Sequence, residues 1–242
     1  MLKRLFLLFA LVSSTVPAFA DQYGAFEQYA DGSSIKPFTR DLGGVLGSAT
    51  FHSARSLGFS GFDIGLRGGM QFSPDRDNLI LRNRGVKVFG LPWMQAEIGL
   101  PFKFDGFIRG ISYQGLTIAG GGLRYGLRKL SDTPWSPQML FSAVGHSVVH
   151  QHFSASQAGG SLVVSAGIPV FTPYAGGGFD RTRLVVRSST LDPNFNGSVV
   201  TTIQSRYTAG MQFRPWTFFY IHLAYVLLHG QSGSEAGMGL RF

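Results

Sequence analysis

Three histidines lie close together in the sequence, at positions 146, 150 and 152. Residues of one parity point to one face of an extended strand, so His150 and His152 present two imidazoles on the same side. Imidazole is a common ligand for zinc and copper. No third ligand is evident beside the pair, so we predict no metal site and interpret these residues as a solvated strand end.

Ser142, His146 and Ser147 invite a second hypothesis, because lipid hydrolases need a serine, a histidine and an orienting acid or amide. Ser142 and His146 share parity but lie about 13 Å apart along a strand. Ser147 faces the opposite side. We therefore predict a protein that is not an enzyme, and keep a lipid hydrolase, completed by residues of other strands, as the less favoured alternative.

Two further motifs suggest ligands only by composition. Asp75, Asp77 and Asn78 form an acidic loop that lacks the glycine and the distal glutamate of a calcium loop. The glycine clusters at residues 120–122 and 176–178 resemble phosphate loops, but no lysine and serine or threonine follow them. Strand bending explains these glycines better, and we expect no cofactor.

The elements that would position these residues are strands with an alternating pattern. Phe62, Ile64, Leu66, Met70 and Phe72 are apolar, and the opposite parity holds Asp63, Arg67 and Gln71. Similar alternation recurs at residues 94–100, 206–213 and 235–242. Because the polar parity is rich in glycine with sparse single charges, the pattern favours a membrane strand with a polar lumen over a soluble sandwich.

Turn signals predict about ten strands from residue 59 onward. Tight connections are expected at Pro101, Pro169 and residues 214–215, and at residues 113–115 and 230–233. Longer loops are expected at residues 73–84, 151–160 and 188–198, with 128–137 as a longish exception on the side of the tight turns. Short periplasmic turns and long outer loops are the rule for outer-membrane barrels. We therefore predict an all-β fold, an antiparallel transmembrane β-barrel.

The first part of the chain is predicted to be a signal peptide followed by a helical segment. Residues 1–20 combine Lys3 and Arg4, an apolar run at 5–12 and an A-x-A cleavage site. In residues 21–58, apolar positions between Ile35 and Leu46 recur at helical spacing, Ser33 and Ser34 are candidate caps, and the Gly43-Gly44 pair weakens the helix. A plug or lid over the barrel, residues 59–242, and a surface helix without further role both remain open.

Composition supports the barrel and excludes several classes. The chain has 242 residues, 33 glycines, 22 phenylalanines and only 14% charged residues. The absence of cysteine excludes disulfides, thiolate zinc sites and cysteine nucleophiles. The formal net charge is +8, but the basic residues are scattered, so we predict no nucleic-acid partner.

The last residues, GMGLRF, resemble the C-terminal signal by which outer-membrane barrels are handed to their insertion machinery, with Met238, Leu240 and the terminal Phe242 as the signal residues. The stretches GFDIGLRGG from Gly61 and LPWMQAEIGLPFKFDGFIRG from Leu91 are similar in style to small, uncharacterised bacterial outer-membrane barrel proteins, without pointing to one named family. The resemblance implies this fold and an outer-membrane location, and it supplies no activity.

The expected function is a narrow passive channel for small, anionic or amphipathic solutes, with outer-membrane lipids, lipopolysaccharide and the insertion machinery as partners. Arginine rings favour anions, but the alternative is an internal arginine–carboxylate network that fills a narrow barrel. A structural or adhesive barrel acting through its outer loops is the second hypothesis. The candidate lumen residues are Asp63, Arg67, Glu97, Arg109, Arg124, Arg206, Glu235 and Arg241.

Overall fold

The computed structural model describes residues 22–128, 133, 135–168 and 170–242. The expected signal peptide at residues 1–20 lies outside the described residues, as do Pro169 and most of residues 129–134 within one predicted connection. Among the described residues, no helix is long and apolar enough to cross a membrane.

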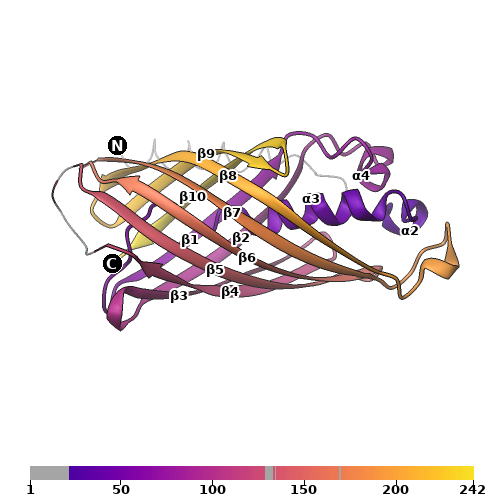
Figure 1. Cartoon of the computed structure of the whole chain (residues 1–242), viewed down its shortest axis with the longest axis horizontal. Helices are drawn as coiled ribbons and strands as arrows, with labels where there is room; N and C mark the ends of the chain where they lie inside the picture. Colours follow the sequence, from indigo (N-terminus) through magenta and orange to yellow (C-terminus); the bar gives the residue numbers. More distant parts are fainter. Residues whose placement is uncertain (1–21, 129–132, 134, 169) are drawn as a thin grey trace, which may run out of the picture.

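Ten antiparallel strands close into a single barrel, which confirms the predicted fold class (Figure 1). Each strand pairs with its neighbours in sequence, and β1 closes the barrel by pairing with β10 from Asp63–Arg241 to Gln71–Gly233. The strands are β1 (Phe62–Gln71), β2 (Phe89–Gly99), β3 (Phe104–Tyr113), β4 (Leu116–Gly126), β5 (Pro137–Val149), β6 (Phe153–Ala166), β7 (Phe171–Val186), β8 (Val199–Trp216), β9 (Phe219–Leu228) and β10 (Gln231–Arg241).

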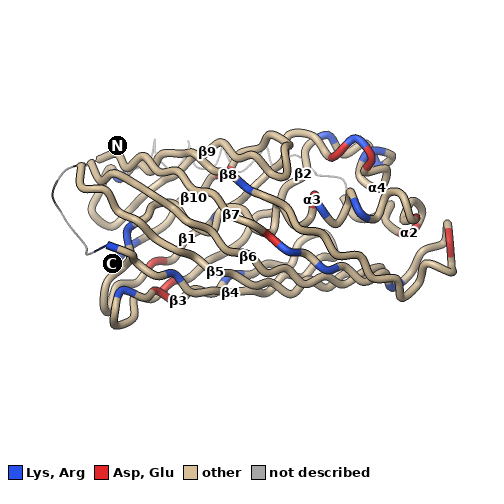
Figure 2. The backbone as a smooth tube through the Cα atoms, viewed as in Figure 1, with Lys and Arg blue, Asp and Glu red and all other residues tan. Residues whose placement is uncertain are grey.

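The predicted alternation separates the two faces of the wall. In β1, Leu66 is 56% exposed on the outside while Asp63 and Arg67 are buried on the inside. Strands β2, β8 and β10 repeat this arrangement, with Met94, Tyr207 and Met238 outside. Long stretches of the wall carry no charged residue, and acidic and basic residues gather around α3 and α4 at one end and near β3 and the C-terminus at the other (Figure 2).

The connections define two ends of the barrel. At the turn end, the η1 turn (Pro101–Lys103) joins β2 to β3, and the C-terminus lies there too. At the loop end, residues 72–88 carry the helix α4 (Leu79–Asn83) and residues 187–198 carry the η2 turn (Pro193–Phe195). The tight turn at Gln114-Gly115 and the long loop after β7 fall where they were predicted.

Three predicted boundaries are wrong. The turn expected at residues 230–233 lies at His229-Gly230, because β10 begins at Gln231. Residues 151–160 are not a loop, because β6 begins at Phe153 and only a tight turn separates it from β5. The small residues of this stretch hide its alternation, although Ala155 and Gln157 face inward. Strand β8 also continues through Pro215 to Trp216, with a register shift after Phe213, so this turn lies at Thr217-Phe218.

The N-terminal segment lies inside the barrel. Helix α2 (Phe26–Tyr29) and the start of α3 (Ile35–Gly47) lie at the loop end, where Gln22 N donates to Gln114 Oε1 over 3.1 Å. The chain then continues to the turn end, where Leu57 N donates to Asp105 Oδ1 over 2.9 Å. Residues 22–57, here called the internal segment, therefore run along the lumen from one end to the other.

Helix α3 is buried on nearly all sides because strands surround it. Phe38, Leu42 and Leu46 join a fully buried apolar cluster with wall residues such as Trp93 and Leu228. Apolar wall residues that point into the lumen thus pack against the apolar face of the helix, in the half of the barrel next to the loop end. Ser34 occupies the N-cap position of α3, but its side chain makes no capping hydrogen bond to the helix, because its Oγ instead accepts from Asp31 N and donates to Tyr29 O.

Candidate functional site

The lumen brings together the candidate residues predicted from alternation. All eight have their side chains on the inner face, and seven are buried, whereas Arg241 lies at the turn end with its guanidinium donating to Ser56 O over 2.9 Å. The network joins them to residues that the sequence did not single out. These are Asp41, His52, Asp105, Asp180 and Tyr220.

The first cluster centres on Glu97, near the turn end. Arg67 Nη2 lies 2.6 Å from Glu97 Oε1, and Arg124 donates to the other carboxylate oxygen. Arg67 also lies 3.4 Å from Asp63, which accepts from the Tyr220 hydroxyl over 2.8 Å. Two arginines and two carboxylates therefore neutralise each other where no bulk water reaches.

The second cluster joins the wall to the C-terminal end of α3. Arg206 Nε lies 3.0 Å from Asp180 Oδ2, and Gln157 Nε2 donates to Asp180 Oδ1 over 2.7 Å. Arg109 Nε lies 2.6 Å from His146 Nε2, and its guanidinium donates to the carbonyls of Leu46 and Ser48 at the helix end. A cation there complements the helix dipole and the free carbonyls.

These contacts determine what the arginines can do. Arg67, Arg124 and Arg206 are each paired with a carboxylate, and Arg109 is used to hold the helix end. A ring of unpaired arginines would attract anions, whereas paired arginines contribute little net potential. The geometry therefore corresponds to the internal network that was the alternative to an anion-favouring constriction.

The internal segment also fills the turn half of the lumen. The His52 ring stacks on Tyr220 with ring centroids 4.2 Å apart, and Phe51 packs edge-on against Tyr174. Ala54 N donates to Ser165 Oγ over 3.0 Å. Polar wall residues thus accept hydrogen bonds from backbone N–H groups of the internal segment after α3, where the segment is extended.

The residues of the hydrolase hypothesis do not assemble. His146 is held between Arg109 and Gln157 inside the barrel, Ser142 is also inside, and Ser147 faces outward. At the loop end, His152 Nδ1 accepts or donates a 2.7 Å hydrogen bond with Ser188 Oγ, and Glu27 Oε2 lies 3.6 Å from the same nitrogen. A triad needs the acid on the other ring nitrogen, so this group is not arranged for nucleophilic catalysis.

Two glycines of α3 determine how closely the helix approaches the wall. A Cβ at Gly43 would lie 2.0 Å from Gln204 Nε2 and 2.1 Å from Thr182 Oγ1. A Cβ at Gly47 would lie 2.4 Å from both carboxylate oxygens of Asp180. The Gly43-Gly44 pair is unfavourable in an isolated helix, but here Gly43 and Gly47 permit the close packing of α3 on the wall.

Replacement of Gly47 by leucine is expected to lower the free energy of unfolding by about 2–4 kcal/mol, because it overpacks the lumen and displaces the Asp180 carboxylate from Arg206. Urea unfolding in lipid vesicles measures this change. Gly167→Leu is the matched control, since a Cβ there would meet nothing within 4 Å. Equal midpoints for the two variants would contradict the close approach.

Comparisons with known proteins find barrels of low similarity. No family model and no curated protein sequence matches the chain. The N-terminal β-barrel domain of Pseudomonas aeruginosa OprF is 12% identical, with 76% of this chain and 99% of that chain covered and a TM-score of 0.41. Ail, the attachment invasion locus protein of Yersinia pestis, is 13% identical, with 76% of this chain and 99% of that chain covered and a TM-score of 0.26. The KdgM porin is 8% identical, with 74% of this chain and 99% of that chain covered and a TM-score of 0.36.

Proposed function

We propose that the protein is an outer-membrane barrel that is closed to solutes while the internal segment occupies its lumen, and that it acts as a structural or adhesive protein through its loop end. The observation that carries this proposal is the path of residues 22–57, which contact the wall from Gln114 at the loop end to Asp105 at the turn end. A barrel of about eight strands is already filled by side chains, and ten strands leave room for little more than this segment.

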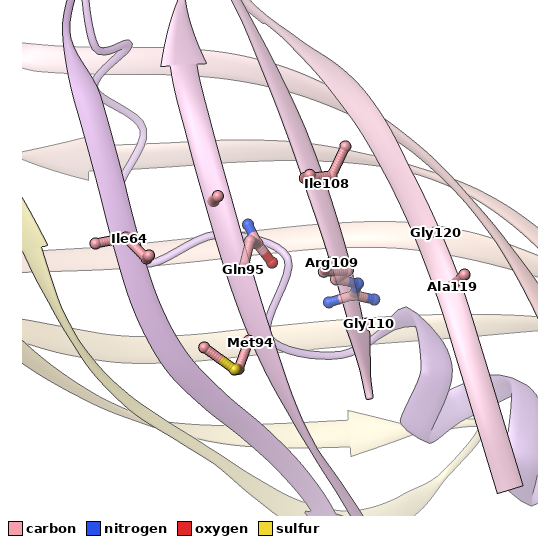
Figure 3. A pocket seen from close by; sticks show the side chains of 9 residues that line it. Ile64, Met94, Gln95, Ile108, Arg109, Gly110, Ala119 and Gly120 are labelled. Atoms are coloured by element: carbon pink, nitrogen blue, oxygen red, sulfur yellow. The ribbon is translucent and has the colours of Figure 1, made fainter. Parts of the chain in front are cut away.

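The outer face of the wall supports the membrane location. Ile64, Met94 and Ile108 on β1, β2 and β3 surround an apolar surface hollow of about 510 Å³ (Figure 3). Exposed aromatic residues surround the turn end, as in the girdles of barrels at the membrane interface. They are Phe59, Phe102, Trp135, Phe171, Trp216, Phe218 and Phe242. Lipids and lipopolysaccharide are the partners that this surface suits.

The loop end is an ordered surface suited to contacts with other molecules. The loop after β7 is bound to the internal segment, because Thr190 N donates to Glu27 O over 2.9 Å and Ser189 Oγ donates to Ala30 O over 2.7 Å. Leu191 in this loop is 56% exposed. The loop after β7 can keep this conformation only while the internal segment stays in the lumen. The segment that fills the barrel therefore also supports the surface at the loop end.

A narrow channel is the second candidate, and the polar inner wall favours it. Several inward side-chain atoms have no hydrogen-bond partner among the described residues, including Gln138 Nε2, Ser142 Oγ and Gln212 Nε2. Water entering a vacated lumen would satisfy them. Under this hypothesis the internal segment is a gate that leaves the lumen.

Single-channel conductance of the full-length mature protein in planar bilayers, with and without a locked segment, separates the two candidates. A Cβ at Gly44 would lie 3.1 Å from Leu228 Cβ, so the Gly44→Cys/Leu228→Cys pair can form a disulfide after α3 and β9 separate by a few tenths of an ångström, in a chain without other cysteines. We expect no discrete openings from the wild type, the oxidised pair or the reduced pair. Each single cysteine variant is the matched control.

If the channel openings vanish on oxidation of the cysteine pair and return on reduction, the protein is a gated channel and the closed-barrel hypothesis is wrong. Retained β-sheet circular dichroism and protease resistance show that a silent sample is inserted.

For the silent barrel, shortening residues 188–198 is expected to abolish cell-surface adhesion or envelope integrity while leaving insertion intact. An unchanged phenotype would contradict a role for the loop end.

A further inference from the structure

Three potential metal ligands from distant parts of the chain meet at the loop end. Asp41 belongs to α3, Asp75 to the loop between β1 and β2, and His229 to the turn between β9 and β10. One ligand atom of each lies within 4.8 Å of the others. The calcium-like loop at Asp75 and Asp77 thus lies beside two further ligands that its sequence motif does not include.

The Asp41 carboxylate is the fixed centre of this group. The residue is completely buried, and its Oδ1 accepts from Gln71 Nε2 over 2.8 Å. Its Oδ2 accepts from Asn78 Nδ2 over 2.7 Å and from Asp75 N over 2.9 Å. These donors fix the orientation of the carboxylate, as hydrogen bonds to metal ligands commonly do.

His229 supplies an observation that is independent of the two acids. Its side chain is 4% exposed, and Nε2 lies 2.9 Å from Asp41 Oδ1. Neither ring nitrogen makes a hydrogen bond within the described part of the chain. The backbone is held with a φ of 43°, and its N donates to Ser205 O over 2.9 Å. Nε2 thus contacts the Asp41 carboxylate without the geometry of a hydrogen bond, and a buried imidazole in this state is costly unless another partner, such as a cation between the two groups, occupies it.

We propose that Asp41, Asp75 and His229 bind one divalent transition-metal ion of the zinc type, which ties the internal segment to the rim of the barrel. Ligand atoms around tetrahedral zinc lie roughly 3.3 Å apart, within the spread of this group. The mixed nitrogen and oxygen set favours zinc over calcium or magnesium, which take oxygen ligands. The Asp75 side chain is 14% exposed, so water can complete the coordination.

Within the part of the chain that the structure describes, the Arg40 side chain competes with a metal ion for Asp75. Arg40 Nη1 lies 3.4 Å from Asp75 Oδ2, but the Arg40 side chain is 38% exposed and can turn into solvent when the ion binds. The site joins α3 to two separate connections, so an ion there opposes any exit of the helix from the lumen. This consequence rests on the proposed closed barrel, whereas metal binding itself does not.

The test is titration of the chelator-treated full-length mature protein with zinc, followed by isothermal calorimetry and metal analysis. We expect one zinc per chain, a higher thermal midpoint with zinc, and much weaker binding of calcium. His229→Gln and Asp75→Asn should each weaken zinc binding by more than about 100-fold, since even loss of an outer hydrogen-bond partner costs 10- to 100-fold. Asp77→Asn, in the same loop and exposed, should bind like the wild type.

Three results would overturn the metal site: no zinc bound at millimolar concentration, unchanged stoichiometry in both His229→Gln and Asp75→Asn, or calcium bound as tightly as zinc. His229→Gln changes only a turn side chain, so it is expected to insert even if Asp75→Asn does not. A conducting protein that binds one zinc would refute the closed barrel and keep the metal site. A protein that gives no conductance and binds no zinc would refute the metal site and keep the closed barrel.

Discussion

Replacing Glu97 by glutamine is expected to lower the free energy of unfolding by about 3–5 kcal/mol, the cost of leaving buried charges uncompensated. Glu97 accepts from both Arg67 and Arg124, whose side chains are almost fully buried. Glutamine keeps the size of the side chain but removes the charge, so the packing is retained while the two guanidinium groups lose their shared partner. Of the two carboxylate oxygens, which accept from Arg67 and Gln95 on one side and from Arg124 on the other, one becomes an NH2 donor that faces a donor.

Urea titration of the protein in lipid vesicles, followed by tryptophan fluorescence, measures this loss. Glu27→Gln is the matched control, because that side chain is 35% exposed and its effect should stay within about 0.5 kcal/mol. The double variant Glu97→Gln/Arg124→Gln should recover part of the stability, since one unpaired cation is then absent. A loss below about 1 kcal/mol for Glu97→Gln would show that the network is hydrated and weak.

Arginine in place of Leu66 is expected to destabilise the inserted barrel by about 2–4 kcal/mol, the cost of a cation near the middle of a bilayer. Leu66 lies in the centre of β1, between Met94 of β2 and Met238 of β10, and it is 56% exposed. Arginine on a face exposed to water would cost little at the same position. The substitution therefore tests whether lipid covers this face.

Leu191→Arg is the control, because Leu191 is also 56% exposed but lies in the loop after β7. The two variants are compared by the folded fraction after refolding into vesicles across a urea series. We expect Leu191→Arg to refold like the wild type. Equal tolerance of arginine at the two positions would contradict a membrane location.

Much of the barrel could be predicted from the sequence because alternation is a local property. Phe62, Ile64 and Leu66 against Asp63 and Arg67 specify which face each side chain occupies before any partner strand is known. The number of strands follows from counting such runs. Alternation fails where both parities are small, and for this reason the loop predicted at residues 151–160 is the start of β6.

The assembly of the lumen could not be predicted, because it depends on contacts between residues far apart in the chain. Local spacing predicts the helix near Ile35, but not that it lies inside the barrel, since the inward apolar residues that cover it are spread over several strands. Asp41 and His229 each look ordinary in the sequence, and only the closed barrel places them 2.9 Å apart.

The path of the internal segment limits the ways in which the barrel can assemble. Gln22 lies at the loop end and Leu57 at the turn end, and the wall around them is sealed where β10, the last strand, pairs with β1. A segment threaded through a ring in this way cannot enter sideways once the seam has formed. The segment is therefore either enclosed while β10 pairs with β1, or it enters lengthwise through one end of the finished barrel, and only the first route lets the wall form directly on the helix that it covers.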